Sequence, residues 1–139
     1  MNDYPSLHVP GAMAPIPSRP AEVPPLDDEL DGQLEDTAGV HAGVDFIRDG
    51  IRLIAHTRLT ADQTQTILST IAGADANLLT ALGLLVKRLT NPGENPALDT
   101  LDAQTAKDVQ QLGEQFAYDL AELAPGDKTT EAAALIDGI

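Results

Sequence analysis

The chain has 139 residues, no cysteine, 3% aromatic residues and a formal net charge of -14. The lack of cysteine excludes disulfides and thiolate metal sites. The acidic charge opposes direct binding to nucleic acid or to anionic membranes, which require Lys and Arg, and it favours basic protein partners. The low aromatic content predicts a core of Leu, Ile, Val and Ala, which suits packed helices better than a sheet.

The segment 1–36 is predicted to be an extended, acidic arm. Seven of the ten prolines fall in its first 25 residues. Each proline fixes its own backbone angle and drives the preceding residue toward extended geometry. Apolar residues such as Tyr4, Val9 and Ile16 are scattered through the segment. They favour an arm that docks along a partner, and a disordered tail is the alternative.

A short helix is predicted near the end of the arm, over residues 26–35. Leu26, Leu30 and Leu34 recur every four residues between acidic side chains, as on one face of a helix. Gly32 weakens this helix, and a helix of this length is marginal in isolation. We therefore expect it to order when its leucines find a groove, and we take the three leucines as candidate interface residues.

Residues 37–139 are predicted to fold as an all-α domain, a small bundle of three to four helices. The first helix is expected over residues 37–58. Its apolar seam repeats at intervals of four and three residues and consists of Val40, Val44, Ile47, Ile51 and Ile54. The far side is interpreted as an ordinary solvated face with i, i+3 ion pairs; it carries His41, Asp45, Arg48, Asp49 and Arg52.

A second stripe of the first helix contains several glycines beside a phenylalanine. Its candidate interface residues are Gly39, Gly43, Phe46 and Gly50. A glycine inside a helix costs about 1 kcal/mol relative to alanine. Three glycines on one stripe therefore suggest that another backbone approaches closely there.

The next helix is predicted to begin at Thr60, where Thr-Ala-Asp-Gln matches a capping box. Because the apolar phase continues past Gly73, one long helix is expected over 61–90, bent at that glycine; two separate helices are the alternative. Its second half is apolar nearly all round, which indicates a buried centre or a shared interface. Three leucines there are candidate interface residues: Leu78, Leu82 and Leu85.

Two further helices complete the predicted bundle. The sequence Asn-Pro-Gly-Glu-Asn-Pro interrupts the chain, and Asn95 is expected to cap a helix over residues 97–123 with Pro96 at its first position. A last short helix is expected over residues 130–137.

The residue types that catalysis or metal binding requires do not converge in this sequence. His41 and Asp45 are spaced for one helix face, but zinc needs three or four ligands. Asp27 to Gly32 imitates the start of a calcium-binding loop, yet Ala38 stands where such a loop needs a bidentate Glu. No nucleophile elbow or phosphate-binding loop occurs. We therefore predict no catalytic residues, no metal and no cofactor.

A helix-turn-helix around Gly73 is also disfavoured, because its second helix would be rich in leucine and would have no base before Lys87. No stretch approaches the roughly 20 apolar residues of a transmembrane helix, and the first residues lack the pattern of a secretory signal. A cytoplasmic protein, or one within a particle assembled in the cytoplasm, is therefore expected.

Two functions fit these observations. The first is a non-enzymatic structural or assembly protein, whose arm docks on neighbouring copies of itself or on other subunits of a complex such as a viral particle. The second is an acidic regulator, or nucleic-acid mimic, that binds a basic protein surface. The second predicts binding that weakens steeply with salt.

Overall fold

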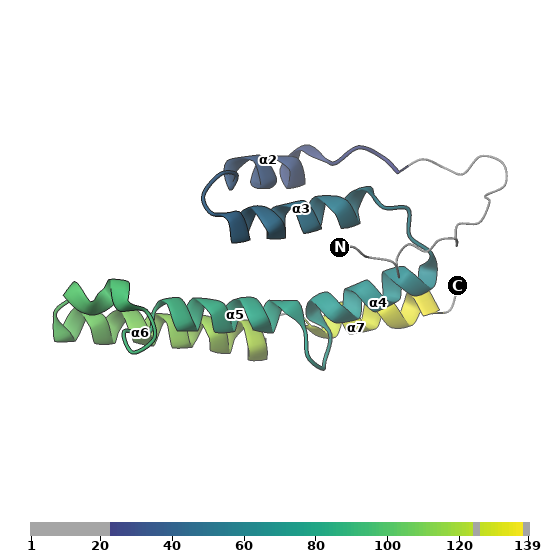
Figure 1. The fold of residues 1–139 in the computed structure, drawn as a ribbon. Helices are drawn as coiled ribbons and strands as arrows, with labels where there is room; N and C mark the ends of the chain where they lie inside the picture. The colour runs from purple at the N-terminus through teal and green to yellow at the C-terminus, as the bar shows by residue number, and fades with distance from the viewer. Residues whose placement is uncertain (1–22, 124–125, 138–139) are drawn as a thin grey trace, which may run out of the picture. The chain divides into compact units, whose positions relative to one another are not determined.

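The structure is a computed structural model that describes residues 23–123 and 126–137. All the regular elements in these two ranges are helical, in agreement with the predicted all-α class (Figure 1). Contacts divide the chain into two compact units, one ending at Leu59 and one beginning at Thr60. Most of the predicted arm lies outside the described residues, so its division from a 37–139 domain stays a prediction.

The first unit holds a hairpin of two helices, α2 (Asp28–Asp36) and α3 (Ala42–His56). Helix α2 corresponds to the short helix expected over 26–35, and it begins where Asp27 accepts a hydrogen bond from the Leu30 backbone N–H at 3.0 Å. Helix α3 is shorter than the predicted 37–58, because the residues before it form a turn. Gly39 adopts a φ of +75° in this turn, which costs glycine little.

The polar side of α3 lies partly against α2: His41 and Asp49 are exposed as predicted for a solvated face, whereas Arg48 and Arg52 contact α2. The Arg48 side chain is 14% exposed, and its Nε donates to the carbonyl oxygen of Leu34 at 2.5 Å. This carbonyl is one of the last four of α2 and lacks an intrahelical donor. Asp45 and Arg48 form the predicted ion pair at 3.3 Å. Arg52 instead pairs with Asp31 of α2, at 3.2 Å.

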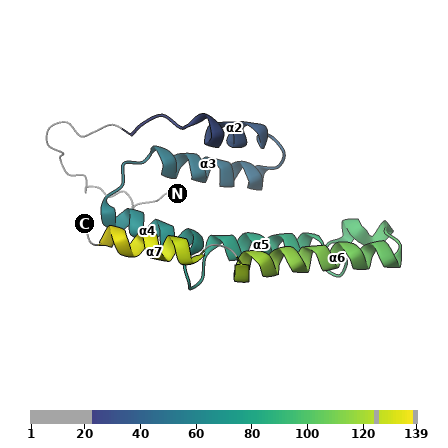
Figure 2. The same ribbon diagram turned by 180° about the vertical axis from the view of Figure 1, so that it is seen from behind.

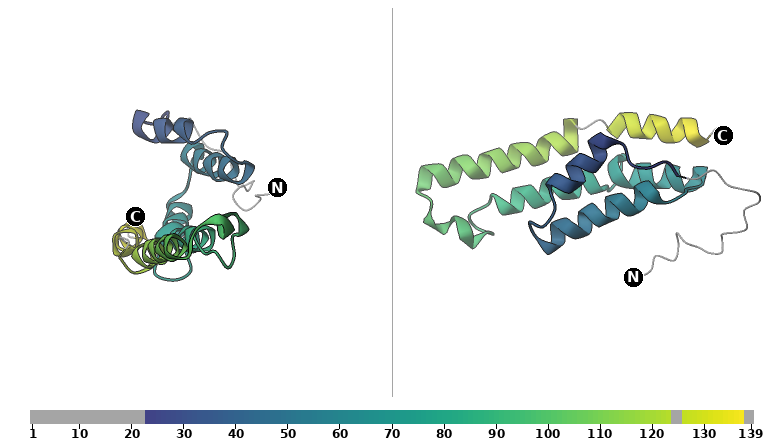
Figure 3. Two further views of the ribbon diagram at one scale, coloured as in Figure 1. Left: turned by 90° about the vertical axis from the view of Figure 1, so that its left-hand side faces the viewer. Right: turned by 90° about the horizontal axis from the view of Figure 1, so that it is seen from above.

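The second unit is built from two rows of helices. Helix α4 (Ala61–Ala72) packs against α7 (Gly126–Asp137), and α5 (Leu78–Leu89) packs against α6 (Ala103–Tyr118). Figures 1 and 2 show α4 and α5 end to end in one row, with α6 and α7 in the other. The view from above shows the same two rows (Figure 3). This unit is therefore a long helical hairpin that is interrupted once in each row.

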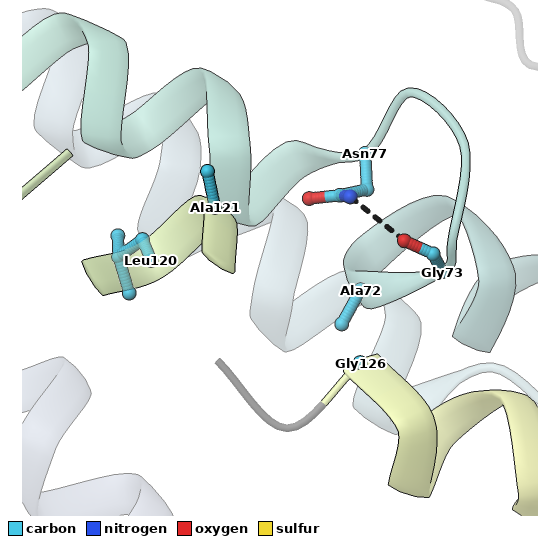
Figure 4. Close-up of a pocket in the computed structure, with 6 residues that line it drawn as sticks. All are labelled: Ala72, Gly73, Asn77, Leu120, Ala121 and Gly126. Atoms are coloured by element: carbon cyan, nitrogen blue, oxygen red, sulfur yellow. Dashed lines mark hydrogen bonds between the residues drawn. The ribbon is translucent and has the colours of Figure 1, made fainter. Parts of the chain in front are cut away.

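The predicted single helix over 61–90 is wrong, and the alternative of two helices is correct. The Thr60 capping box is present, with reciprocal hydrogen bonds to Gln63 at 3.0 and 3.1 Å. However, α4 ends at Ala72, because Gly73 is extended. Asn77 then starts α5 by accepting a hydrogen bond from the Thr80 N–H at 2.8 Å. Its Nδ2 also donates to the Gly73 carbonyl (Figure 4), which fixes the loop.

The predicted helix over 97–123 is divided as well. Asn95 caps as expected, but it starts only a 3₁₀ turn, Pro96–Thr100. Asp102 starts α6 itself: its carboxylate accepts hydrogen bonds from the Thr105 N–H and hydroxyl, both at 2.9 Å. A π turn, Asp119–Leu123, follows α6. The helix expected over 130–137 is α7, which begins earlier, at Gly126.

Small residues line the contact between α5 and α6. Gly83 and Gly113 are buried. A Cβ on Gly83 would lie 3.2 Å from the Cα of Ala117, and a Cβ on Gly113 would overlap the Thr90 side chain. The two helices therefore approach closely at these glycines, which leaves no room for larger side chains there.

Candidate interface surfaces

The described residues offer little for catalysis or metal binding. Across 23–123 and 126–137, no three His, Asp or Glu side chains gather as metal ligands, and no polar or charged side chain is buried. The His41 Nδ1 accepts the Gly43 N–H at 2.8 Å, so this nitrogen serves as the cap of α3. Asp27, from the calcium-like run, likewise caps α2.

A hollow lies at the junction between the two helix pairs of the second unit (Figure 4). Gly73 and Asn77 line it together with four apolar or small residues, namely Ala72, Leu120, Ala121 and Gly126. Its most polar side chain, the Asn77 amide, already bonds to backbone groups. The lining therefore supplies no acid, base or nucleophile that could act on a substrate.

The most unusual feature of the described chain is the exposure of its large apolar side chains. The buried apolar residues are Leu34 and three alanines: Ala72, Ala117 and Ala133. Fifteen larger side chains are exposed instead: Val40, Phe46, Ile47, Ile51, Leu53, Ile54, Leu78, Leu82, Leu84, Leu85, Leu89, Leu112, Phe116, Tyr118 and Leu135. Large exposed apolar patches mark sites of interaction, so these side chains are candidates for an interface.

In the first unit, the predicted interface residues differ in how far they are exposed to solvent. Leu34 is buried, with 4% of its surface exposed, while Leu26 and Leu30 are half-buried. Phe46 is 76% exposed on α3. The apolar seam of α3 is also exposed at three isoleucines: Ile47, Ile51 and Ile54. Helix α3 contacts α2 through its polar side, so α2 does not cover this apolar seam.

The glycine stripe has three separate local explanations. Gly39 lies in the turn before α3, where its positive φ favours glycine. A Cβ on Gly43 would lie 3.2 Å from His41 Nδ1, within the helix cap. A Cβ on Gly50 would have no neighbour within 4 Å. No backbone of the described residues approaches Gly50, and the space beside it is open.

In the second unit, the predicted leucines Leu78, Leu82 and Leu85 are all exposed. The sequence interpretation missed exposed apolar residues on α6, of which Leu112 and Phe116 are the largest. Their helical spacing was visible in the sequence. It did not indicate exposure, because the same spacing fits a buried core, and here glycine and alanine occupy the inner seam instead.

Comparison with known proteins finds no protein-family model, no curated protein and no solved structure that matches this chain. Among the described helices, none combines the length and the apolar character needed to cross a membrane.

Proposed function

We propose that the chain is a non-enzymatic structural subunit of a larger protein assembly, in which copies of itself or other subunits cover its apolar helix faces. The observation that supports this is the contrast between fifteen exposed large apolar side chains and a buried set consisting mainly of alanine. Burying one large apolar side chain contributes about 1.5–3 kcal/mol. Ordering each residue costs about 1–2 kcal/mol, so partners would supply burial that the units lack.

In this proposal, the arm of residues 1–36 docks on a neighbouring subunit, and a viral particle is one setting in which such an arm would act. Leu26 and Leu30 remain half-buried and are available to a partner groove. The acidic charge of the chain suits solubility before assembly.

Size-exclusion chromatography with light scattering tests the proposal on the full chain. We expect a mass at least twice that of one chain, and a higher mass as the protein concentration rises. A mass of one chain at every concentration would overturn assembly from copies of this chain. Deletion of residues 1–22 tests the role of the arm: a weaker assembly supports it, and an unchanged assembly assigns association to the helices alone.

An acidic regulator that binds a basic protein surface is the second candidate function. Three of the described arginines, Arg48, Arg52 and Arg88, pair with acids of the same chain. These pairs neutralise three of the eight Lys and Arg side chains, and the chain has 22 Asp and Glu side chains in all. Binding to a basic protein would support this candidate if affinity fell steeply as salt was raised.

A further inference from the structure

The α5–α6 hairpin carries two apolar stripes that its own packing does not cover. The stripe on α5 is Leu78, Leu82, Leu85 and Leu89, and the stripe on α6 is Val109, Leu112 and Phe116. Both repeat at intervals of three and four residues, as in helices that pack side by side over several turns. Six of the seven side chains are exposed; Val109 is half-buried.

Both stripes lie on the same side of the hairpin. The two helices contact each other at Gly83 and Gly113, because Gly83 lies next to Ala117 and Gly113 lies next to Thr90. Each stripe precedes this contact by one residue, which in a helix is a rotation of about 100°. Since α5 and α6 run antiparallel, equal rotations turn the two stripes toward the same side. Together they form one surface, which we call the leucine face.

Charges around the leucine face fit a second copy of this chain. The two stripes contain no charged residue, so two leucine faces can meet without burying charge. By helical spacing, Arg88 of α5 and Asp108 of α6 lie beside the two stripes, whereas the other charged residues of these helices lie on the opposite side: Lys87, Lys107 and Glu114. Placing α5 of one copy on α6 of another therefore puts Asp108 at the same rim as Arg88, which also pairs with Glu94 of its own chain, so opposite charges face each other there.

We propose that two copies of the chain associate through their leucine faces to form an antiparallel four-helix bundle. This rests on the proposed assembly function and assigns the surface and the partner. A two-fold axis parallel to the helices puts α5 of each copy on α6 of the other at the same height. Because Thr90 meets Gly113 within one hairpin, Leu89 then contacts the partner's Leu112.

Adjacent leucines of α5 provide a matched pair of variants for the first test. Leu85 belongs to the leucine face and is 45% exposed; Leu84 is 53% exposed and points away from that face. In full-length protein, Leu85→Glu is expected to raise the dimer dissociation constant about 100-fold or more, because it places an unpaired carboxylate in an apolar contact. Leu84→Glu is expected to leave it within about threefold, since its charge stays in water.

Cysteine cross-linking gives a second test that does not depend on a destabilised variant, since the chain has no natural cysteine. Leu89→Cys protein and Leu112→Cys protein are mixed and oxidised. The expected product is a disulfide-linked dimer of the two variants, formed faster than by either variant alone. Equal rates in the mixture and in the separate variants would overturn the arrangement.

The outcomes separate this inference from the function on which it rests. Association that persists in Leu85→Glu, or that Leu84→Glu disrupts equally, overturns the leucine face as the interface but leaves an assembly protein. A wild-type chain that is monomeric at every concentration overturns the dimer and with it assembly from copies of this chain. A loss of mass in Leu85→Glu alone, with a cross-link in the mixture, supports both.

Discussion

At the residue scale, Asp102 shows how one side chain determines where a helix begins. The backbone N–H and the hydroxyl of Thr105 both donate to its carboxylate at 2.9 Å. The backbone hydrogen bond and then the hydroxyl bond lower the pKa of Asp102 from its ordinary value of 3.8. Because these bonds favour the ionised form, the folded chain binds a proton here less readily than the unfolded chain does.

This pKa shift predicts a pH-dependent contribution of Asp102 to stability. A lowered folded-state pKa means that the contribution is complete above 3.8 and is lost as pH falls through the folded value. Asp102→Ala should therefore lower the melting temperature at pH 7, and the difference from wild type should shrink as pH falls below 3.8. Circular dichroism melts over this range measure the difference.

The control for this experiment is Asp75→Ala, at an exposed residue of the α4–α5 loop. It removes the same charge without removing a helix cap, so its effect on the melting temperature should be smaller and should change little with pH. A difference between wild type and Asp102→Ala that stays constant, or grows, as pH falls would contradict the role given to the carboxylate.

At the scale of the helices, the small residues between α5 and α6 determine how closely the rows approach. A Cβ on Gly113 would overlap the Thr90 side chain, whose hydroxyl is held by the Val86 carbonyl at 2.8 Å. Gly113→Ala gains about 1 kcal/mol of helix propensity, but overpacking costs about 1–3 kcal/mol. We expect a net loss of about 1 kcal/mol in the free energy of unfolding, measured by urea denaturation.

Gly50→Ala is the matched control, because a Cβ there would have no neighbour within 4 Å. The same substitution inside α3 should raise the stability by up to about 1 kcal/mol. If Gly113→Ala and Gly50→Ala shifted the unfolding midpoint in the same direction, the close contact between α5 and α6 would not be the reason for the glycine.

The helices were predictable from sequence wherever a local signal specified them. The Thr60 capping box specifies the start of α4, and the repeat of Leu26, Leu30 and Leu34 predicts the short helix α2. The break after Ala72 was missed because the apolar spacing continues across it. Asn and Asp are typical N-cap residues. A prediction based on Asn77 and Asp102, in place of the continuous apolar spacing, would have located the starts of α5 and α6 correctly.

Long-range contacts account for most of what the sequence could not predict. The spacing of Arg48 and Arg52 fits a solvated helix face equally well, and only the position of α2 reveals their role against Leu34 and Asp31. The leucine stripe of α5 was recognised as a candidate interface. The apolar stripe on α6 was not recognised, because its exposure depends on which residues of α6 pack against α5, and these are Gly113 and Ala117.

At the scale of the whole molecule, the proposed dimer brings together two chains that each carry a formal charge of -14. Like net charges repel at long range, and salt screens this repulsion over about 8 Å at physiological ionic strength. Apolar contact is not weakened by such screening, and exposed ion pairs at the rim contribute little. Added salt should therefore favour self-association through the leucine face.

We accordingly predict that the dimer dissociation constant falls about threefold or more when sodium chloride is raised from about 50 mM to 500 mM, because screening removes repulsion between two acidic chains. Analytical ultracentrifugation at several protein concentrations measures the constant. Leu84→Glu, which adds one acid outside the leucine face, should show the same trend with a slightly steeper slope. Self-association that weakens steeply with salt would indicate that complementary charges hold the chains together, and would contradict an apolar interface.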